Sequence, residues 1–135
     1  MRLELTLGDW LKAGTAAAAA LWCSTPPLLQ LLLTLMVIDM LTGILAAIYN
    51  RELDSSISFR GVCKKAIALL VVAAGAALEP NVGLPVADTI AGFYCAGELI
   101  SVIENAARAG LPVPDIVRDV LLKLNPKADV EPRRT

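Results

Sequence analysis

Residues 28–48, LLQLLLTLMVIDMLTGILAAI, decide the fold of this chain, because they form a long apolar run with a single charge, Asp39, near its middle. As an α-helix at ~1.5 Å per residue, this run reaches roughly 31 Å, which matches the hydrocarbon core of a bilayer. A charged side chain at that depth costs roughly 2.5–3.5 kcal/mol and usually faces protein or water instead of lipid. The run therefore predicts a membrane helix that contacts other helices through polar groups.

The composition of the whole chain fits a small membrane protein. The 135 residues amount to one domain, 56% of them are apolar, and the mean hydropathy is +0.64. A net charge of −1 gives no general attraction to nucleic acid. There is no histidine, and the three cysteines show no C-x-x-C spacing. We therefore expect no metal site, no disulfide framework, no cofactor and no enzymatic activity.

Prolines, glycines and charged turns divide the chain into four apolar segments and a short amphipathic helix. The segments cover residues 10–23, 28–48, 62–78 and 84–103; the amphipathic helix covers 115–124, and a polar tail follows over 125–135. Glu79, Pro80, Asn81 and Gly83 predict a compact turn after the third segment.

The predicted fold is a single all-α membrane domain over residues 1–135, with about four transmembrane helices. The first segment, 10–23, is only fourteen residues long and reaches roughly 21 Å as a helix. The alternative is that this segment lies at the membrane surface, which leaves three crossings.

Lysine and arginine residues orient the predicted helices. The connection over 49–65 holds four basic residues and the chain beyond Ile103 holds six, whereas the turns at 24–27 and 79–83 hold none. By the positive-inside rule, both termini and the middle connection are predicted to lie in the cytoplasm. Arg60, Lys64 and Lys65 are interpreted as a basic anchor on that side, because lysine amines reach headgroups while their stems stay in apolar surroundings.

Two of the predicted membrane helices carry a face of small and polar residues. Small residues let another helix approach closely, and polar side chains donate hydrogen bonds across the contact. Two interpretations stay open for the carboxyls: they are bonded within one subunit, or they line an opening between subunits. The predicted packing or pore-lining positions are Asp39, Thr42, Gly43, Glu98, Ser101 and Asn105.

The order of these motifs resembles the phage lysis and toxin-secretion holin family. The resemblance covers roughly residues 30–124. It includes D-x-x-T-G at Asp39–Gly43, Ser55-Ser56, Phe59-Arg60-Gly61, Lys64-Lys65, the stretch ELISVIEN at 98–105, and GLPVP at 110–114.

The resemblance implies a phage or prophage protein of the bacterial cytoplasmic membrane. Such a protein is expected to assemble with copies of itself in the lipid bilayer and to release an endolysin or a toxin, without necessary direct contact with that partner. The family has no catalytic residue, so none is carried over. The matched positions are carried over as motif residues only.

Three other functions compete with this hypothesis. A small ion channel or transporter would use Asp39 and Glu98 as a cation or proton path. A membrane enzyme acting on lipid headgroups would need clustered carboxylates, and D-x-x-T-G supplies one acid only. A scaffold would hold a partner through the helix at 115–124.

Overall fold

The computed structural model describes residues 6–52 and 55–124, and its regular elements in these ranges are all helices. They are α1 (Leu7–Ser24), α2 (Pro27–Tyr49), α3 (Ser55–Val82), α4 (Val86–Arg108) and α5 (Asp115–Leu124). The prediction of an all-α protein is confirmed, and α5 covers the same residues as the predicted amphipathic helix.

Three of these helices are long and apolar enough to cross a membrane. The candidate spans are Pro27–Tyr49, Phe59–Val82 and Val86–Arg108. A helix of 23 residues reaches roughly 35 Å, which exceeds the hydrocarbon thickness slightly and allows some tilt. The helix α1 is not among the candidate spans. Length and composition therefore favour the three-crossing alternative.

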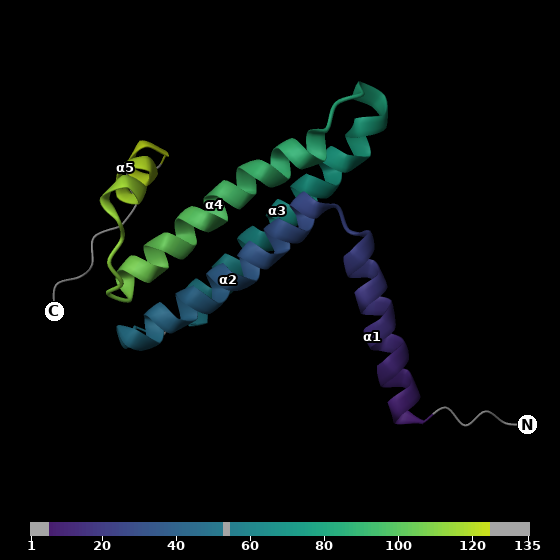
Figure 1. Cartoon of the computed structure of the whole chain (residues 1–135), viewed down its shortest axis with the longest axis horizontal. Coiled ribbons are helices and arrows are strands. Elements are labelled where there is room, and N and C mark those ends of the chain that lie inside the picture. The colour runs from purple at the N-terminus through teal and green to yellow at the C-terminus, as the bar shows by residue number, and fades with distance from the viewer. Residues whose placement is uncertain (1–5, 53–54, 125–135) are drawn as a thin grey trace, which may run out of the picture.

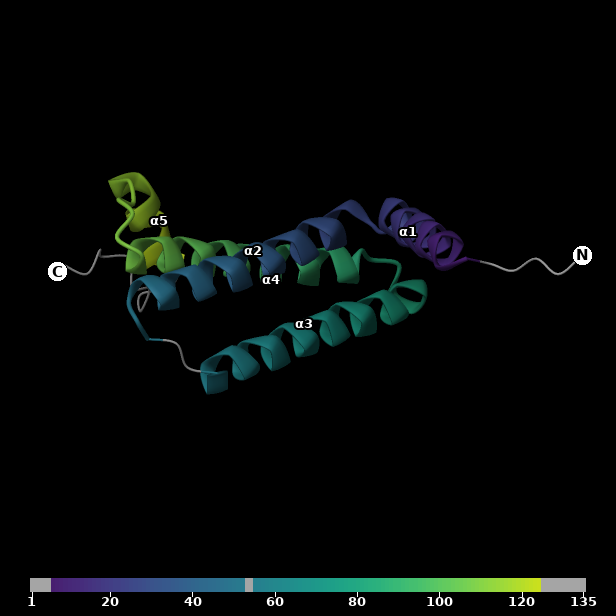
Figure 2. The ribbon, with the colours of Figure 1, turned by 90° about the horizontal axis from the view of Figure 1, so that it is seen from below.

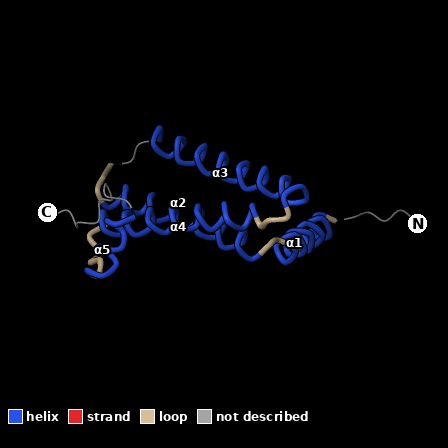
Figure 3. The backbone as a smooth tube through the Cα atoms, turned by 90° about the horizontal axis from the view of Figure 1, so that it is seen from above, coloured by secondary structure: helices blue, strands red, loops and turns tan. Residues whose placement is uncertain are grey.

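The three membrane-length helices form an elongated bundle. Helices α2 and α4 run side by side in the same direction, and α3 lies on one side of this pair and runs in the opposite direction (Figures 1 and 2). Helix α3 lies close to its neighbours at its C-terminal end and diverges from them toward its N-terminal end (Figure 3). Contacts between α4 and each of the other two hold the bundle together.

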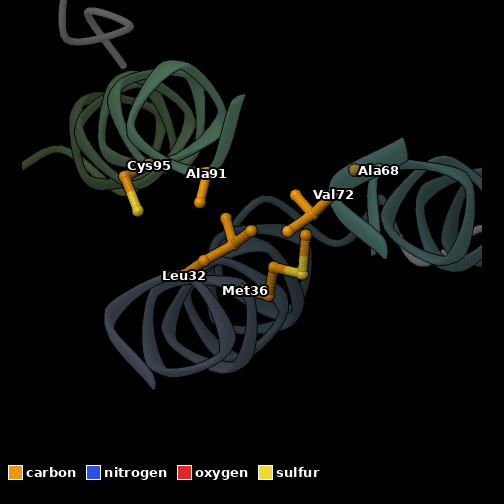
Figure 4. Close-up of a cluster of buried hydrophobic side chains, with 6 residues drawn as sticks. All are labelled: Leu32, Met36, Ala68, Val72, Ala91 and Cys95. Carbon is orange, nitrogen blue, oxygen red and sulfur yellow. The ribbon is translucent and has the colours of Figure 1, made fainter. Parts of the chain in front are cut away.

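A small apolar core fills the space where the three helices meet. Each helix contributes two buried residues: Leu32 and Met36 from α2, Ala68 and Val72 from α3, and Ala91 and Cys95 from α4 (Figure 4). The pair from α4 is small, so α4 can approach α2 closely. Most other apolar side chains of the bundle stay exposed, which leaves them for lipid or for other copies.

Gly75 sets the closest approach of α3 to α4. A Cβ atom at this position would lie 2.8 Å from Cδ1 of Ile90, 3.3 Å from Cγ1 of Val86 and 3.4 Å from the backbone Cα of Ala87. A side chain at Gly75 therefore has no room unless the helices separate. This contact explains why α3 is nearest to α4 at its C-terminal end.

The turn predicted for 79–83 is wrong in its first half, because α3 continues through Pro80 to Val82. Proline lacks an N–H donor, so one hydrogen bond to the preceding turn is missing at Pro80, and the helix ends within one turn of it. The helix ends at Val82 and is closed by the next residue, Gly83, whose φ of +67° suits glycine and whose N–H donates to the Glu79 carbonyl at 2.9 Å. Glu79 Oε1 accepts a hydrogen bond from the Ala87 N–H at 2.8 Å, so the last turn of α3 caps the start of α4.

The outer helices differ in how they join the bundle. No residue of α1 is buried, and α1 points away from the bundle at a wide angle (Figure 1). Helix α5 instead turns its apolar face toward α4. The two helices enclose an apolar groove of about 270 Å³ lined by Ala96, Leu99, Ile100, Ile103, Ile116, Val117 and Val120.

Candidate functional site

One charged side chain from each membrane-length helix meets at a single point in the bundle. Lys65 of α3 donates from Nζ to Asp39 Oδ2 of α2 at 2.8 Å and also to Glu98 Oε2 of α4. The three side chains are only 13–14% exposed. We call Asp39, Lys65 and Glu98 the charged cluster. It is the strongest polar link between the three helices.

Local helix geometry places these groups on the inner faces. On α3, Lys65 shares a face with Ala68 and Val72 of the core, three and seven residues further on. Lys64, its neighbour in sequence, is exposed. Successive residues of a helix point ~100° apart, so only one of two adjacent lysines can face the core.

Asn105 extends the charged cluster along α4. It lies seven residues after Glu98, is 8% exposed, and donates from Nδ2 to Asp39 Oδ1 at 3.0 Å. A longer contact of 3.4 Å joins the same nitrogen to Thr42 Oγ1. Both oxygens of Asp39 thus have a donor, one from each neighbouring helix. The arrangement offsets much of the cost of a carboxylate at this depth.

Gly43 provides the space for Asn105. A Cβ atom at Gly43 would lie 3.4 Å from Nδ2 of Asn105. The adjacent Thr42 hydroxyl lies 2.9 Å from the Ile38 carbonyl and 3.1 Å from the Asp39 carbonyl, to which it donates within its own helix. The D-x-x-T-G sequence therefore places three features on one face of α2: the carboxylate of Asp39, the hydroxyl of Thr42 and the space left by Gly43.

A second polar contact joins the ends of α2 and α4. Asn50 donates from Nδ2 to the Arg108 carbonyl at 2.9 Å, which satisfies one of the free carbonyls at the end of α4. Arg108 lies 3.8 Å from Glu52, with partly exposed side chains. An exposed ion pair of this kind contributes little to stability. The hydrogen bond from Asn50 to the Arg108 carbonyl is therefore the shorter of the two contacts between the ends of α2 and α4.

The charged cluster carries an excess of one negative charge, since two carboxylates share one ammonium. Such an arrangement is stable in an apolar region only while the three groups stay together. Among the described residues, no group of three His, Cys, Asp or Glu side chains could hold a metal ion. The charged cluster holds the helices together, and its charged side chains become available to water if the helices separate.

The structure brings together most of the residues that the sequence singled out. Asp39, Thr42, Gly43, Glu98 and Asn105 lie within one connected group. Ser101 is half-buried on α4 and takes no part in the hydrogen bonds of the charged cluster. Which of these residues contribute to function stays a prediction.

The basic anchor predicted at 60–65 divides into two environments. Arg60 and Lys64 are exposed, in agreement with a position at the headgroups. Lys65 differs, because its amine lies between two carboxylates instead of extending to solvent. The sequence carries no signal for this difference. Ala68, Val72 and Gly75 lie three, seven and ten residues after Lys65 and four, eight and eleven after Lys64, so helical spacing places both lysines beside the same face.

Comparisons with known proteins agree on one family. The chain matches the bacteriophage holin family over residues 16–126. It is 35% identical over 95 residues to a probable holin of Bacillus phage phi105, a match that covers 69% of this chain and 70% of that protein. No solved structure matches.

Two bacterial relatives are uncharacterised proteins. One, from Listeria innocua, is 34% identical over 106 residues, which cover 77% of this chain and 76% of the relative. The other, from Clostridium perfringens, is 35% identical over 103 residues, with 74% and 76% covered. The matched region of the family includes all three membrane-length helices and the charged cluster.

Proposed function

The chain belongs to the bacteriophage holin family, and from this premise we propose that it assembles with copies of itself in the host's cytoplasmic membrane. The assemblies open lesions through which an endolysin, or a toxin, leaves the cytoplasm. A holin is a membrane protein of lysis and not an enzyme. The observation that carries the proposal is the family match over three membrane-length helices.

Oligomerisation follows from the size of the bundle. Three helices pack around a core of six buried residues, so one copy encloses no passage for a folded protein. Large exposed apolar side chains remain on all three spans. In a membrane these surfaces contact either lipid or another copy. A protein-sized lesion therefore requires many copies.

The charged cluster suggests how an inserted but inactive protein could change into one that forms a lesion. While Lys65 bridges Asp39 and Glu98, the helices present an apolar exterior and the charges are satisfied inside one copy. If the helices separate, three charged side chains and Asn105 lose these partners. Each charge left in lipid costs roughly 2.5–3.5 kcal/mol, so the opened state favours contact with water. Open copies would then line a hydrated edge together.

Charge distribution supports a cytoplasmic C-terminal side. The connection between α2 and α3 holds Arg51, and Arg60 and Lys64 follow on the first turns of α3. Arg108, Arg118 and Lys123 lie at or beyond the end of α4. These residues fall at the same end of the bundle, which the positive-inside rule places in the cytoplasm. A cytoplasmic N-terminus as well would require α1 to cross.

Expression together with an endolysin tests the proposed function. Cells that make this chain and an endolysin without its own export signal should show an abrupt fall in turbidity after a delay. Cells that make either protein alone should not lyse, although this chain alone should stop growth. The proposal is overturned if the chain inserts in the membrane at normal level and the endolysin stays in the cytoplasm.

The second candidate function, a small ion channel or transporter, is favoured by the acidic residues at the helix contact. It predicts selective ion flux without passage of proteins. Purified protein in vesicles loaded with an ion indicator, a small dye and a folded enzyme separates the two functions. Release of the enzyme supports the holin, whereas ion flux alone supports the channel.

A further inference from the structure

We propose that α1 is a surface-binding helix that lies flat on the outer face of the cytoplasmic membrane, with one side in the lipid and the other in water. The partner is the lipid surface itself. This inference concerns how the chain is seated in the membrane, and it holds whether or not the chain forms lesions.

The first argument is the distribution of side chains around α1. At ~100° per residue, the large apolar residues gather in a sector of about 120°. That sector contains Leu7, Trp10, Leu11, Leu21 and Trp22. The opposite side carries Asp9 and Lys12 together with alanines. A helix with one strongly apolar side and one charged side is typical of binding parallel to a membrane surface.

The second argument is the position of the two tryptophans. They are the only tryptophans in the chain, and both belong to α1. On the helix surface they fall at the two edges of the apolar sector, where the side chain of a surface-bound helix meets the headgroups. Tryptophan favours that level because its ring is apolar and its N–H is a hydrogen-bond donor.

The third argument is that nothing in the described chain covers this apolar side. Leu7 is 76% exposed and Leu21 is 70% exposed, and no residue of α1 is buried. Five large apolar side chains left in water would be costly. The protein around them is already embedded in lipid, so the same lipid is the nearest apolar medium.

The fourth argument is the corner between α1 and α2. Thr25 donates from its hydroxyl to the Leu21 carbonyl at 2.8 Å, Gln30 donates from Nε2 to the Trp22 carbonyl, and prolines occupy positions 26 and 27. These bonds close the end of α1, and the prolines prevent a continuous helix. The chain therefore turns where α2 enters the membrane, and α1 leaves the bundle at a wide angle (Figure 1).

The side of the membrane follows from the number of crossings. Three spans beginning with α2 and a cytoplasmic C-terminal side place the start of α2 on the outer face. Helix α1 joins α2 there. Up to Cys23 the chain holds two basic residues, Arg2 and Lys12, and two acidic residues, Glu4 and Asp9. The two basic residues are fewer than the four of the connection over 49–65 and the six beyond Ile103, so the preference of lysine and arginine for the cytoplasm acts less on this segment than on those two.

Cysteine labelling tests the proposal with two matched substitutions. Ala16 and Ala18 lie in the middle of α1, two residues apart, on the water side and the lipid side of the proposed helix. In a chain whose native cysteines are replaced by alanine, Ala16→Cys should react with a membrane-impermeant maleimide on intact cells. Ala18→Cys should react several-fold less. The chain with native Cys23 alone, which is exposed on the water side near the corner, gives the reference level.

The other outcomes overturn the proposal. A crossing α1 places both positions at the middle of the bilayer, so both stay unlabelled before and after permeabilisation while Cys23 still reacts from outside. Labelling of either position only after permeabilisation places α1 on the inner face. Equal labelling of Ala16→Cys and Ala18→Cys from outside means that α1 is free in water. The lysis assay is independent of all these results, so a failure here leaves the proposed function standing.

Discussion

At the scale of single residues, Lys65 is the most informative side chain of the bundle. Its amine pairs with both Asp39 and Glu98 and so links α3 to α2 and to α4. An ion pair of this kind adds little over a well-packed apolar replacement, but removal of one partner leaves unpaired charge in an apolar region. The energetic weight of the charged cluster is therefore seen when one member is lost.

Lys65→Met is expected to destabilise the bundle strongly. Two carboxylates would then face each other without a cation, which costs about 3 kcal/mol for side chains this far from water. Unfolding of the purified protein in mild detergent, followed by circular dichroism against added denaturing detergent, measures the loss. Lys64→Met is the matched control, because Lys64 is exposed, and it should change stability by no more than about 0.5 kcal/mol. Equal effects of the two substitutions would contradict the role of Lys65.

Asn105→Ala is expected to weaken the contact between α2 and α4. The substitution removes the donor to Asp39 Oδ1 and leaves that oxygen without a partner, at a cost of about 1–3 kcal/mol. The same unfolding measurement applies. Ser101→Ala, one turn earlier on α4, is the control and should be close to neutral. A neutral Asn105→Ala would mean that water replaces the amide.

At the scale of elements, the approach of α3 to α4 depends on the absence of a side chain at Gly75. Gly75→Leu should separate the helices near the turn and destabilise the bundle by about 1–3 kcal/mol, because the space is already filled by Ile90, Val86 and Ala87. Gly97→Leu on α4 is the control, since no atom lies within 4 Å of a Cβ atom there. Cross-linking of cysteine pairs across the α3–α4 contact would report the separation directly.

The first turn of α1 is expected to respond to acid. Hydrogen bonds from the Thr6 hydroxyl and the Thr6 N–H hold the pKa of Asp9 below its ordinary value of 3.8. A lowered pKa in the folded state means that the stabilisation is present above that ordinary value and is lost as pH falls through the lower one. The protection of the Gly8–Trp10 amides against exchange, expressed relative to the intrinsic exchange rate at each pH, should therefore fall below about pH 4 in vesicles.

Asp9→Asn is the control for this pH effect. It removes the titrating group, so the stability of the first turn should no longer change between pH 6 and pH 3. A pH response that persists in Asp9→Asn would assign the effect to another group. The prediction concerns the start of α1 only, and the three membrane-length helices should be unaffected.

At the scale of the whole molecule, stability and lesion formation make different demands on the charged cluster. The triple change Asp39→Asn, Lys65→Met and Glu98→Gln removes all three charges together. Because it leaves no unpaired charge, it should recover most of the stability lost in Lys65→Met alone. It also removes the groups that would favour water at the edge of a lesion. We therefore expect a folded, inserted protein whose lysis onset is much delayed or absent.

Co-expression with an endolysin measures that delay, and quantitative membrane fractionation confirms equal insertion. If cells with the triple variant lyse as early as cells with the unchanged protein, the charged cluster does not contact water at the edge of the lesion, and this prediction is contradicted. Loss of stability equal to that of Lys65→Met would instead contradict the charge argument itself. The two readouts therefore test packing and function separately.

Local sequence determined the helices and most of their ends. Apolar runs of membrane length, the prolines at 26 and 27, and Gly83 fix where helices start and stop, because these effects act over a few neighbouring residues. Three ends differed most from the predicted segments. Helix α3 begins at Ser55, seven residues before the segment predicted from 62, and continues two residues past Pro80; helix α4 extends to Arg108, five residues past 103. The polar face with Asp39 and the face with Glu98 were also readable, since helical spacing alone aligns them.

Tertiary structure alone decided which faces meet. A helix pattern gives the side on which a residue lies, but not the rotation of one helix against another or the partner it finds. Thus the sequence treated Lys64 and Lys65 as one anchor, whereas packing of α3 turned Lys65 toward two carboxylates and left Lys64 outside. The bond from Asn105 to Asp39 and the cap from Glu79 to Ala87 have the same origin, because each joins residues from different helices.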